Sequence, residues 1–357
     1  MRRIYLARHG RPDFPGGEKY CLGSTDMPLS PFGRLQACLL GRELRGMVSA
    51  VFTSPLSRAA DTARFIAPEP VVITGLAEAS MGDWDGLSFR EIKLRWPELY
   101  AARGRDANIP MPDSESFEHA QRRFAAAVGE ALGQSGGDIA IVAHNAVMQS
   151  FLCLISGSDE YRAAEYRSAY GGYYIIEYDG KGFAPQFPAI VPQFEPDDAL
   201  CAALMEAVPL PERVREHCRA VCREADRIAS ELTAAGRELD AVLIHRAALL
   251  HDIARTQPEH PAAGAAWLRG LGSPELADIV RQHHDLDAPA EVNEAAVVYI
   301  ADKCVGDAER IPLERRFEKS FAKCKDDKAR EAHRRRAAEA LGLKEIINTY
   351  CRKEIIQ

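Results

Sequence analysis

Features that are missing from this sequence exclude several classes of protein. No apolar run reaches the roughly 18 residues that a membrane-spanning helix needs, and the strand-like start shows no signal-peptide pattern. Positive charge is not in excess, since 45 Lys and Arg residues stand against 52 Asp and Glu residues. The net charge therefore gives no long-range attraction to nucleic acid or to an anionic membrane. We expect a soluble, cytoplasmic protein that binds small anions at local sites and has no membrane or nucleic-acid partner.

Closely spaced cysteine pairs of the CxxC kind are also missing. The nine cysteines are an odd number and are spread along the chain, which is typical of reduced thiols. Cys218 and Cys222 lie about one turn apart on an expected helix, where both packing and metal binding are open, and we favour packing. The cysteines therefore predict no disulfide framework.

The length of 357 residues and an apolar content of 46% are sufficient for two hydrophobic cores. Between Gly180 and Pro211 the pattern of regular elements fails, because prolines recur throughout this stretch. We place a proline-rich linker at residues 183–196. It separates a first domain, residues 1–182, from a second domain, residues 197–357.

Strand and helix patterns alternate in the first domain, which indicates an α/β fold. Short apolar runs typical of buried strands occupy residues 4–7, 50–53, 71–73, 138–143 and 173–177. Helices are expected at residues 31–45 and 58–66, and along the stripe formed by Phe117, Phe124, Val128 and Leu132.

Cationic and imidazole side chains follow three of these apolar runs. Arg8 and His9 come directly after the first run, Arg58 follows the second, and His144 follows the third. Because the carboxyl ends of parallel strands meet at one edge of a sheet, we expect the four side chains to surround one pocket. Gly10 lets the backbone turn closely past a ligand. Arginine beside imidazole favours a phosphate group as that ligand.

Six segments, in the same order along the chain, resemble the histidine phosphatase superfamily, which has the phosphoglycerate mutase-like fold, and within it the α-ribazole phosphatase-type branch. The resemblance implies a three-layer fold with a mostly parallel sheet. The segments are Arg8-His9-Gly10, residues 23–37, Thr53-Ser54-Pro55-Leu56-Ser57-Arg58-Ala59, Leu76-Ala77-Glu78, Gly82-Asp83-Trp84-Asp85-Gly86 and Val142-Ala143-His144.

The resemblance also implies a mechanism that needs no cofactor. His9 would attack phosphorus and become a phosphohistidine. Arg8, Arg58 and His144 would hold the phosphoryl oxygens, and Glu78 would be the general acid and then the general base. The implied substrate is an α-ribazole phosphate-like ester or a sugar phosphate.

A wider set of residues is expected to contact the substrate. Asn145 could reach the substrate or cap the helix that begins there, and we favour capping. Glu115 could contact the substrate or cap a helix, with neither role preferred. The span from Glu78 to His144 lacks the long insert typical of the mutases, which favours water as the phosphoryl acceptor, whereas a mutase or phosphotransferase using His9 is the alternative. The expected substrate contacts are Arg8, Ser24, Thr25, Arg58, Glu115 and Asn145.

The sequence of the second domain predicts a series of helices with histidine and aspartate residues at their edges. Mixed nitrogen and oxygen ligands suit a metal such as Fe, Mn, Ni, Co or Zn. A single histidine beside an apolar helix face is usually a core residue whose ring nitrogens have hydrogen-bond partners. Five histidines and two aspartates at helix edges are harder to explain in that way. The residues are His217, His251, Asp252, His260, His283, His284 and Asp302.

Residues 197–320 resemble an HD-domain metal-dependent phosphohydrolase, through Leu249-Leu250-His251-Asp252-Ile253-Ala254 and the other His and Asp positions. The resemblance implies a centre of one or two ions, with Asp252 as a possible bridge, and a nucleotide or related phosphate as substrate. His284 would lie outside the ligand set. The implied ligands are His217, His251, Asp252 and Asp302, with His260 and His283 as extra ligands of two-metal members.

We therefore predict a bifunctional phosphohydrolase, with a regulatory, nucleotide-sensing second domain as the alternative. The helical tail at residues 315–336 is rich in Arg and Lys, with acidic residues interspersed. It could contact a polyanionic ligand, but the mixed charge favours a solvated helix face.

Overall fold

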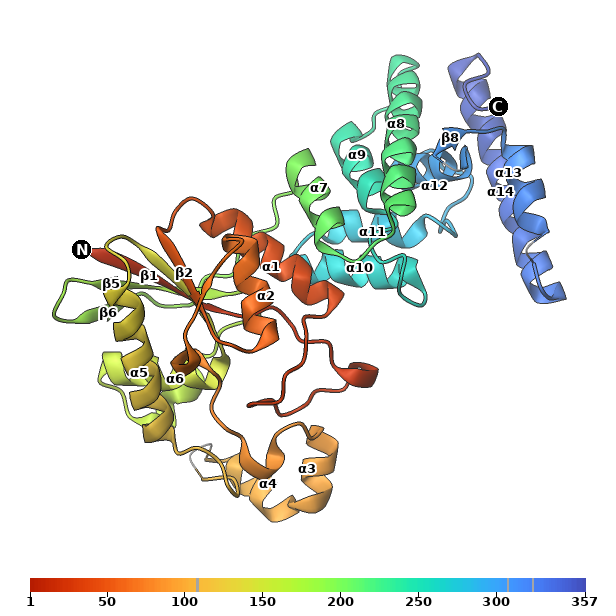
Figure 1. Ribbon diagram of the computed structural model, residues 1–357. Coiled ribbons are helices and arrows are strands. Elements are labelled where there is room, and N and C mark those ends of the chain that lie inside the picture. The colour runs from red at the N-terminus through yellow and green to blue at the C-terminus, as the bar shows by residue number, and fades with distance from the viewer. Residues whose placement is uncertain (107–108, 307, 323) are drawn as a thin grey trace. The chain divides into compact units, whose positions relative to one another are not determined.

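The computed structural model describes residues 1–106, 109–306, 308–322 and 324–357. The chain divides into two compact units, a first unit, Met1–Gln193, and a second unit, Phe194–Gln357 (Figure 1). The first unit includes residues 183–193, which the sequence alone assigned to the linker.

The first unit is built on a six-stranded sheet of order β3-β2-β4-β1-β5-β6. Strands β3, β2, β4 and β1 are parallel, whereas β5 and β6 continue the sheet antiparallel. The predicted mostly parallel α/β sheet is therefore confirmed, and β6 is an edge strand that the sequence did not reveal. The strands are β1 (Arg2–Arg8), β2 (Ala50–Thr53), β3 (Val71–Val72), β4 (Ile139–Ala143), β5 (Tyr173–Tyr178) and β6 (Phe183–Pro185).

Strand β1 is apolar on both faces because helices cover both sides of the sheet. Ile4 and Leu6 pack in one hydrophobic cluster, and Tyr5 and Ala7 pack in another. Figure 1 shows α1 and α2 on one face and α5 and α6 on the other, which gives the expected three layers. These helices are α1 (Pro31–Leu44), α2 (Ser57–Ile66), α5 (Phe117–Gly133) and α6 (Asn145–Ser156).

A small helical subdomain between the motif segments at residues 82–86 and 142–144 was not predicted. Helices α3 (Phe89–Arg95) and α4 (Pro97–Arg103) pack around Trp84 and Ile92 in a separate apolar cluster. Ser88 caps α3 and forms a capping box with Glu91. The short 3₁₀ helices are Pro15–Gly17, Thr74–Leu76, Gly82–Trp84 and Glu160–Tyr166.

The second unit is helical, as expected. Helix α8 buries an apolar stripe formed by Val214, Cys218, Val221, Ala225, Ile228 and Leu232. At the chain end, the carbonyl of Ile355 accepts hydrogen bonds from Arg227 and Arg310. The helices are α7 (Asp198–Ala207), α8 (Glu212–Ala234), α9 (Ala241–Leu250), α10 (His260–Leu271), α11 (Pro274–Gln282), α12 (Glu294–Lys303), α13 (Leu313–Phe321) and α14 (Asp327–Cys351), with a hairpin of β7 (Val305–Gly306) and β8 (Glu309–Arg310). Among the described residues, no helix combines the length and the apolar character needed to cross a bilayer.

Candidate functional site

His9 lies just beyond the carboxyl end of β1 and is buried. Its Nδ1–H donates to the carbonyl of Gly10 at 2.6 Å, which leaves Nε2 as the unprotonated ring nitrogen. Burial lowers the pKa of His9 well below its ordinary value, and the positive charges of Arg58 and Arg8 lower it further. The imidazole is therefore held in the neutral, nucleophilic form.

Two arginines beside His9 are held in place by backbone carbonyls. The Nη atoms of Arg58 donate to the carbonyls of Thr25 and Gly23 at 2.8 and 2.9 Å. Arg8 donates from Nη1 to the carbonyl of Ser168 at 2.6 Å. The Nε atoms of both arginines are buried without a partner in the part of the chain that the structure describes. Fixed cations with unused donors suit an anion bound between them.

His144 follows β4 and faces His9 across the site. The two ring centroids are 5.0 Å apart. Nε2 of His144 forms a hydrogen bond with Oγ of Ser54 at 2.7 Å, and Nδ1 is buried without a partner among the described residues. Burial lowers the pKa of His144 well below its ordinary value, and the neighbouring His9 and arginines add to this effect.

The Glu78 carboxylate accepts hydrogen bonds from three backbone amides. These are the amides of Ala79 at 2.9 Å, Ala146 at 3.1 Å and Val147 at 3.0 Å, the last two at the start of α6. Burial raises the pKa of Glu78, and the three amides oppose this by favouring the charged form. The net direction is upward, so Glu78 keeps a proton more readily than an exposed glutamate does.

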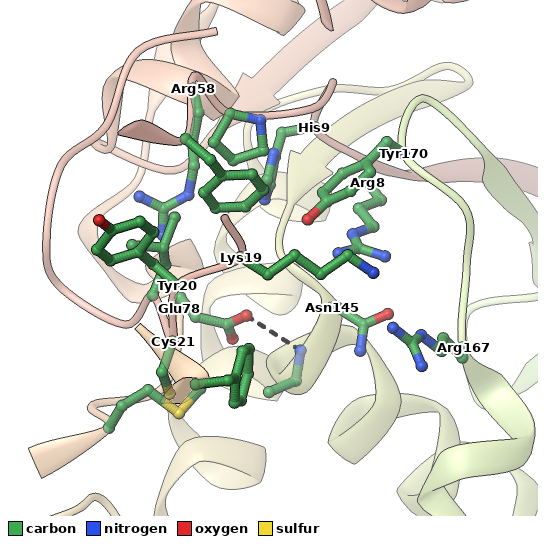
Figure 2. Close-up of a pocket in the computed structure, with 16 residues that line it drawn as sticks. Arg8, His9, Lys19, Tyr20, Cys21, Arg58, Glu78, Asn145, Arg167 and Tyr170 are labelled. Atoms are coloured by element: carbon green, nitrogen blue, oxygen red, sulfur yellow. Dashed lines mark hydrogen bonds between the residues drawn. The ribbon is translucent and has the colours of Figure 1, made fainter. Parts of the chain in front are cut away.

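His9, Arg8, Arg58 and Glu78 line one pocket of about 230 Å³, whereas His144 is fully buried and is not among the lining residues. Aromatic rings of Phe14, Tyr20 and Phe89 form part of its wall, and Phe14 stacks on Tyr20 with centroids 6.3 Å apart. Lys19 and Arg167 add two further cations to the lining. Figure 2 shows Arg167 across the pocket from Arg58, with the Lys19 side chain extending between them. The site is small and strongly cationic.

The second unit contains a cluster of imidazoles and carboxylates. Nε2 of His217 lies 2.9 Å from Oδ1 of Asp302, and Nε2 of His251 lies 3.8 Å from the same oxygen. On the other side, Oδ1 of Asp252 lies 3.1 Å from Nε2 of His260 and 3.6 Å from Nε2 of His283. Asp252 therefore stands between two groups of histidines.

The hydrogen bonds of two histidines turn their ligand nitrogens towards this cluster. Nδ1–H of His251 donates to the carbonyl of Ala248 at 2.8 Å, and Nδ1–H of His283 donates to that of Val280 at 2.6 Å. Their Nε2 atoms are thus the unprotonated ones. Nε2 of His251 and Oδ1 of Asp252 are buried without hydrogen-bond partners among the described residues. Such orphaned lone pairs are expected where a metal ion binds, so the residues fit a metal centre.

The protonation states in this cluster are those that metal ligands require. Burial lowers the pKa of His251 to about 4, which keeps the imidazole neutral. Burial alone would raise the pKa of Asp252, but the neighbouring His251, His260 and His283 outweigh it and hold that pKa below its ordinary range. Asp302 is likewise held ionised, chiefly by the Lys303 ammonium 2.6 Å from its Oδ2.

A cavity of about 590 Å³ opens beside this cluster. His217, Asp252 and Asp302 lie in its wall. Four cations also line it: Arg213, Arg255, Arg316 and Lys319. The last two belong to α13, so part of the basic tail lines this cavity.

Two families match the chain in sequence order. The histidine phosphatase superfamily (branch 1) matches residues 4–189, more than half of the chain. The chain belongs to the histidine phosphatase superfamily. The HD domain matches residues 214–307. The two families named from the sequence motifs thus both match, a histidine phosphatase followed by an HD domain.

Relatives of this histidine phosphatase carry several activities in their names. The "bifunctional protein Rv2228c" of Mycobacterium tuberculosis is 34% identical over 149 residues, which are 40% of this chain and 41% of that protein. The "metal-independent phosphoserine phosphatase" of Arabidopsis thaliana is 31% identical over 169 residues, 44% of this chain and 69% of that protein. Among solved structures, the α-ribazole phosphatase from Shigella flexneri is 27% identical with a TM-score of 0.45, covering 52% of this chain and 94% of that one.

The histidine phosphatase pocket brings together His9, Arg8, Arg58 and Glu78, all of which the sequence had singled out for one site. Asn145 lines it as well, but it does not cap α6, because its Nδ2 donates to Gln149 and the Glu78 carboxylate takes the helix-start amides. The capping role that we favoured for Asn145 is therefore wrong. Its Oδ1 is buried without a partner among the described residues.

Three of the expected substrate contacts lie elsewhere. Oγ of Ser24 and the amide of Thr25 bond to Asp85 at 2.6 and 2.9 Å, and neither residue lines the pocket. Glu115 also lies outside the pocket lining and pairs with Arg123 at 2.8 Å. It does not cap α5 either, since Ser116 is the capping residue. These residues support the loops around the pocket.

Sequence reasoning missed several residues that line or support the two sites. Lys19 and Arg167 lie on loops outside every recognised motif, so no local signal could find them. His284, placed outside the ligand set, lies close to His260 and His283 and could share an ion with them. Cys222, predicted to pack, is buried, and its Sγ also lies 3.3 Å from Nδ1 of His245.

Proposed function

We propose that this chain is a bifunctional phosphohydrolase whose first unit cleaves a small phosphate ester through a phosphohistidine at His9. The observation that carries the proposal is the hydrogen bond from Nδ1–H of His9 to the Gly10 carbonyl, which leaves Nε2 available to a pocket flanked by Arg8 and Arg58. A neutral imidazole between fixed cations is the arrangement that phosphoryl transfer to histidine requires.

In the first step, Nε2 of His9 attacks phosphorus, and the bond from phosphorus to the ester oxygen breaks as the P–N bond forms. Arg8, Arg58 and His144 hold the phosphoryl oxygens and offset their negative charge in the transition state. Protonated Glu78 gives its proton to the departing oxygen, so the leaving group departs as an alcohol. The raised pKa of Glu78 supports this role.

In the second step, water attacks the phosphohistidine. The Glu78 carboxylate takes a proton from the water as the P–O bond forms and the P–N bond breaks, and phosphate leaves. The same arginines hold the phosphoryl oxygens in both steps, because His9 is the nucleophile in the first displacement at phosphorus and the leaving group in the second. Glu78 ends the cycle protonated and His9 ends it neutral.

The volume of the first pocket supports a small substrate. We propose an α-ribazole phosphate-like ester or a sugar phosphate. The names of the relatives, which include phosphoserine and glucosyl-3-phosphoglycerate phosphatases, support small phosphate esters as a class.

For the second unit we propose a metal-dependent hydrolysis of a nucleotide or related phosphate. His217, His251, Asp252 and Asp302 would hold a metal ion, and His260 and His283, which also approach Asp252, would serve a second ion where two are bound. The bound metal lowers the pKa of a water and neutralises phosphoryl oxygens. The cavity of about 590 Å³ and its four cations support a larger, polyanionic substrate than the first pocket takes.

The test is a phosphate-release screen of the full chain over a panel of phosphate esters and nucleotides, with added Mn²⁺ or Fe²⁺ and with EDTA. We expect some small esters to be hydrolysed in EDTA and nucleotides only with metal. Detection of product phosphate on an acceptor instead of as free anion would assign the first unit to the mutase or phosphotransferase class. Binding of a nucleotide without turnover would assign the second unit to regulation.

A further inference from the structure

A second group of metal-ligating side chains lies on helices of the second unit and shares no residue with the HD-domain cluster. Cys222 and Asp226 stand one turn apart on α8, so their side chains lie on the same face of that helix. His245 belongs to α9, which packs against both α8 and α7 (Figure 1). None of these three residues lines the cavity beside the HD-domain cluster. The thiol, the carboxylate and the imidazole therefore form a separate group.

The three ligand atoms of this group form a triangle of the size found around a zinc ion. Sγ of Cys222 lies 3.3 Å from Nδ1 of His245, and that nitrogen lies 2.9 Å from Oδ2 of Asp226. The third edge, from Sγ to the same carboxylate oxygen, is 3.8 Å. Zinc bond lengths of about 2.0–2.3 Å and tetrahedral angles give edges of about 3.4–3.6 Å between ligand atoms. Shifts of about half an ångström or less bring all three edges to these values.

Negative charge in this group is not balanced by arginine or lysine. Oδ2 of Asp226 lies 2.9 Å from Nδ1 of His245, and Oδ1 of Asp198 lies 3.5 Å from its Nε2. Among the residues that the structure describes, neither carboxylate forms an ion pair with a Lys or Arg side chain. One imidazole therefore faces two carboxylates and a thiol, an excess of anionic ligands that a divalent cation offsets.

Asp198 at the start of α7 suits the histidine to metal binding. When Nδ1 of His245 is a ligand, the proton of the neutral ring is on Nε2, the nitrogen that faces Asp198. A carboxylate beside the second nitrogen of a metal-bound histidine fixes the ring orientation and makes the ligand nitrogen more basic. Burial raises the pKa of the Cys222 thiol, and the carboxylates of Asp226 and Asp198 raise it further, so without a cation the sulfur keeps its proton.

We propose that Cys222, Asp226 and His245 bind a zinc-class divalent cation, with water at the fourth position. Coordination exchanges the S–H bond of Cys222 for a bond from sulfur to the metal and releases that proton to water. A thiolate ligand selects a softer cation than the nitrogen and oxygen ligands of the HD-domain cluster do. Asp198 orients the histidine from α7 and so connects a third helix to the ion. The inference does not depend on the proposed function of either unit.

The experiment titrates Co²⁺ into the full chain after removal of metal, under reducing and anaerobic conditions. Co²⁺ replaces Zn²⁺ in such sites, and a thiolate ligand adds a sulfur-to-cobalt charge-transfer band in the near ultraviolet. The HD-domain cluster offers histidine and aspartate ligands, so Co²⁺ bound there gives no such band. Zn²⁺ is then added in competition, and the loss of the band measures the affinity of the thiolate site for zinc.

We expect wild type to give the charge-transfer band and Zn²⁺ to abolish it. Cys222→Ser should remove the band and lower the metal content of the zinc-loaded protein by one equivalent, because the sulfur ligand is gone. Asp198→Asn should keep the band but weaken zinc binding by roughly ten- to a hundredfold. Cys218→Ala, which removes the other buried thiol of α8, is the matched control and should keep both the band and the wild-type affinity.

Three results would overturn the inference. The first is a wild-type protein without the band, and the second is a band that survives Cys222→Ser. The third is a band that is lost in Cys218→Ala, which would assign the thiolate ligand to Cys218.

Asp226→Asn carries the test if Cys222→Ser does not fold, because the Asp226 side chain is 43% exposed and its replacement leaves the core intact. This variant should keep the far-ultraviolet circular dichroism of wild type and bind zinc more than tenfold more weakly. Unchanged zinc affinity in Asp226→Asn would contradict its role as a ligand.

Discussion

The two sites of this chain solve the same chemical problem in different ways. In the first unit, the positive charge that would face a phosphate is carried by the side chains of Arg8 and Arg58. Both guanidinium groups are held in place by hydrogen bonds to backbone carbonyls. In the second unit, histidines and carboxylates point their lone pairs at one another, and the atoms Nε2 of His251 and Oδ1 of Asp252 have no partner among the described residues. The cations of the first site are side chains of the protein, and the side chains of the second site could hold a metal ion.

This difference teaches how each site depends on its surroundings. Hydrogen bonds to fixed carbonyls preorganise the arginines of the first site, and we expect its chemistry to proceed without a metal. In the second site, a bound ion would stabilise neutral histidines beside ionised carboxylates, so under the proposed function both its geometry and its activity would depend on metal. The difference between the two sites is tested most directly by replacing one residue in each of them.

The largest effect is expected from His9→Ala and Asp252→Ala, measured side by side. His9→Ala should lower hydrolysis of small phosphate esters by about 10⁴-fold or more, because the nucleophile is lost. Asp252→Ala should lose bound metal and the metal-dependent hydrolysis, because the residue that both histidine groups approach is gone. The measurements are phosphate release in both assays and metal analysis of the purified proteins.

Each of these variants is the control for the other. Asp252→Ala should retain ester hydrolysis in EDTA, and His9→Ala should retain metal. Acid quenching of wild type with labelled ester should trap an acid-labile, base-stable phosphoenzyme that is missing in His9→Ala. Loss of both activities in either single variant would contradict two independent sites.

A smaller effect, which sharpens the account of the first site, is expected from Glu78→Gln. The amide cannot give a proton to the departing oxygen, so turnover of alkyl phosphates should fall by about 10²- to 10³-fold. An aryl phosphate with an acidic leaving group should lose much less, since its oxygen needs less protonation. Equal losses for alkyl and aryl esters, measured as kcat, would show that Glu78 only anchors the start of α6.

Much of the first site could be predicted because its chemistry lies where buried strands end. The apolar run before Arg8 and His9 fixes a strand, and parallel pairing of β1 with β4 then places His144 beside His9. The second site followed from the concentration of imidazoles at helix edges. In both cases the local pattern and the overall topology agree, which is the condition under which sequence reasoning succeeds.

Other features could not be predicted because distant residues decide them. Asn145 stands at the start of α6, where local rules favour a capping side chain, but Glu78 supplies the acceptor from another part of the chain. Glu115 lies in a loop that resembles a family motif, but its carboxylate forms an ion pair with Arg123. Lys19 and Arg167 reach the pocket only through loop conformations that no periodicity encodes.

A still smaller effect is expected from Ser54→Ala, which loosens one of the hydrogen bonds that preorganise the first site. Oγ of Ser54 bonds to Nε2 of His144 at 2.7 Å, and both side chains are buried. Without this bond the imidazole can turn, so kcat should fall by about tenfold while KM changes little. Ser49→Ala, which removes an exposed hydroxyl bonded to Ser135, is the matched control. A Ser54→Ala protein with wild-type kcat would show that His144 is positioned by packing alone.

The smallest effect is a shift along the pH axis, and it tests the preorganisation directly. Burial, together with Arg58 and Arg8, lowers the pKa of His9, which disfavours its protonated form. The neutral nucleophile should therefore persist as the pH falls below about 6.5, the ordinary value for histidine.

We expect ¹⁵N NMR of the unliganded protein at pH 6 to show His9 with an unprotonated Nε2 and a protonated Nδ1. A His9 ring that gains its second proton at or above pH 6.5 would contradict this, because the fixed cations would then not be acting on it. Replacing Arg8 by Gln should move the transition to higher pH, since one of the two neighbouring positive charges is gone.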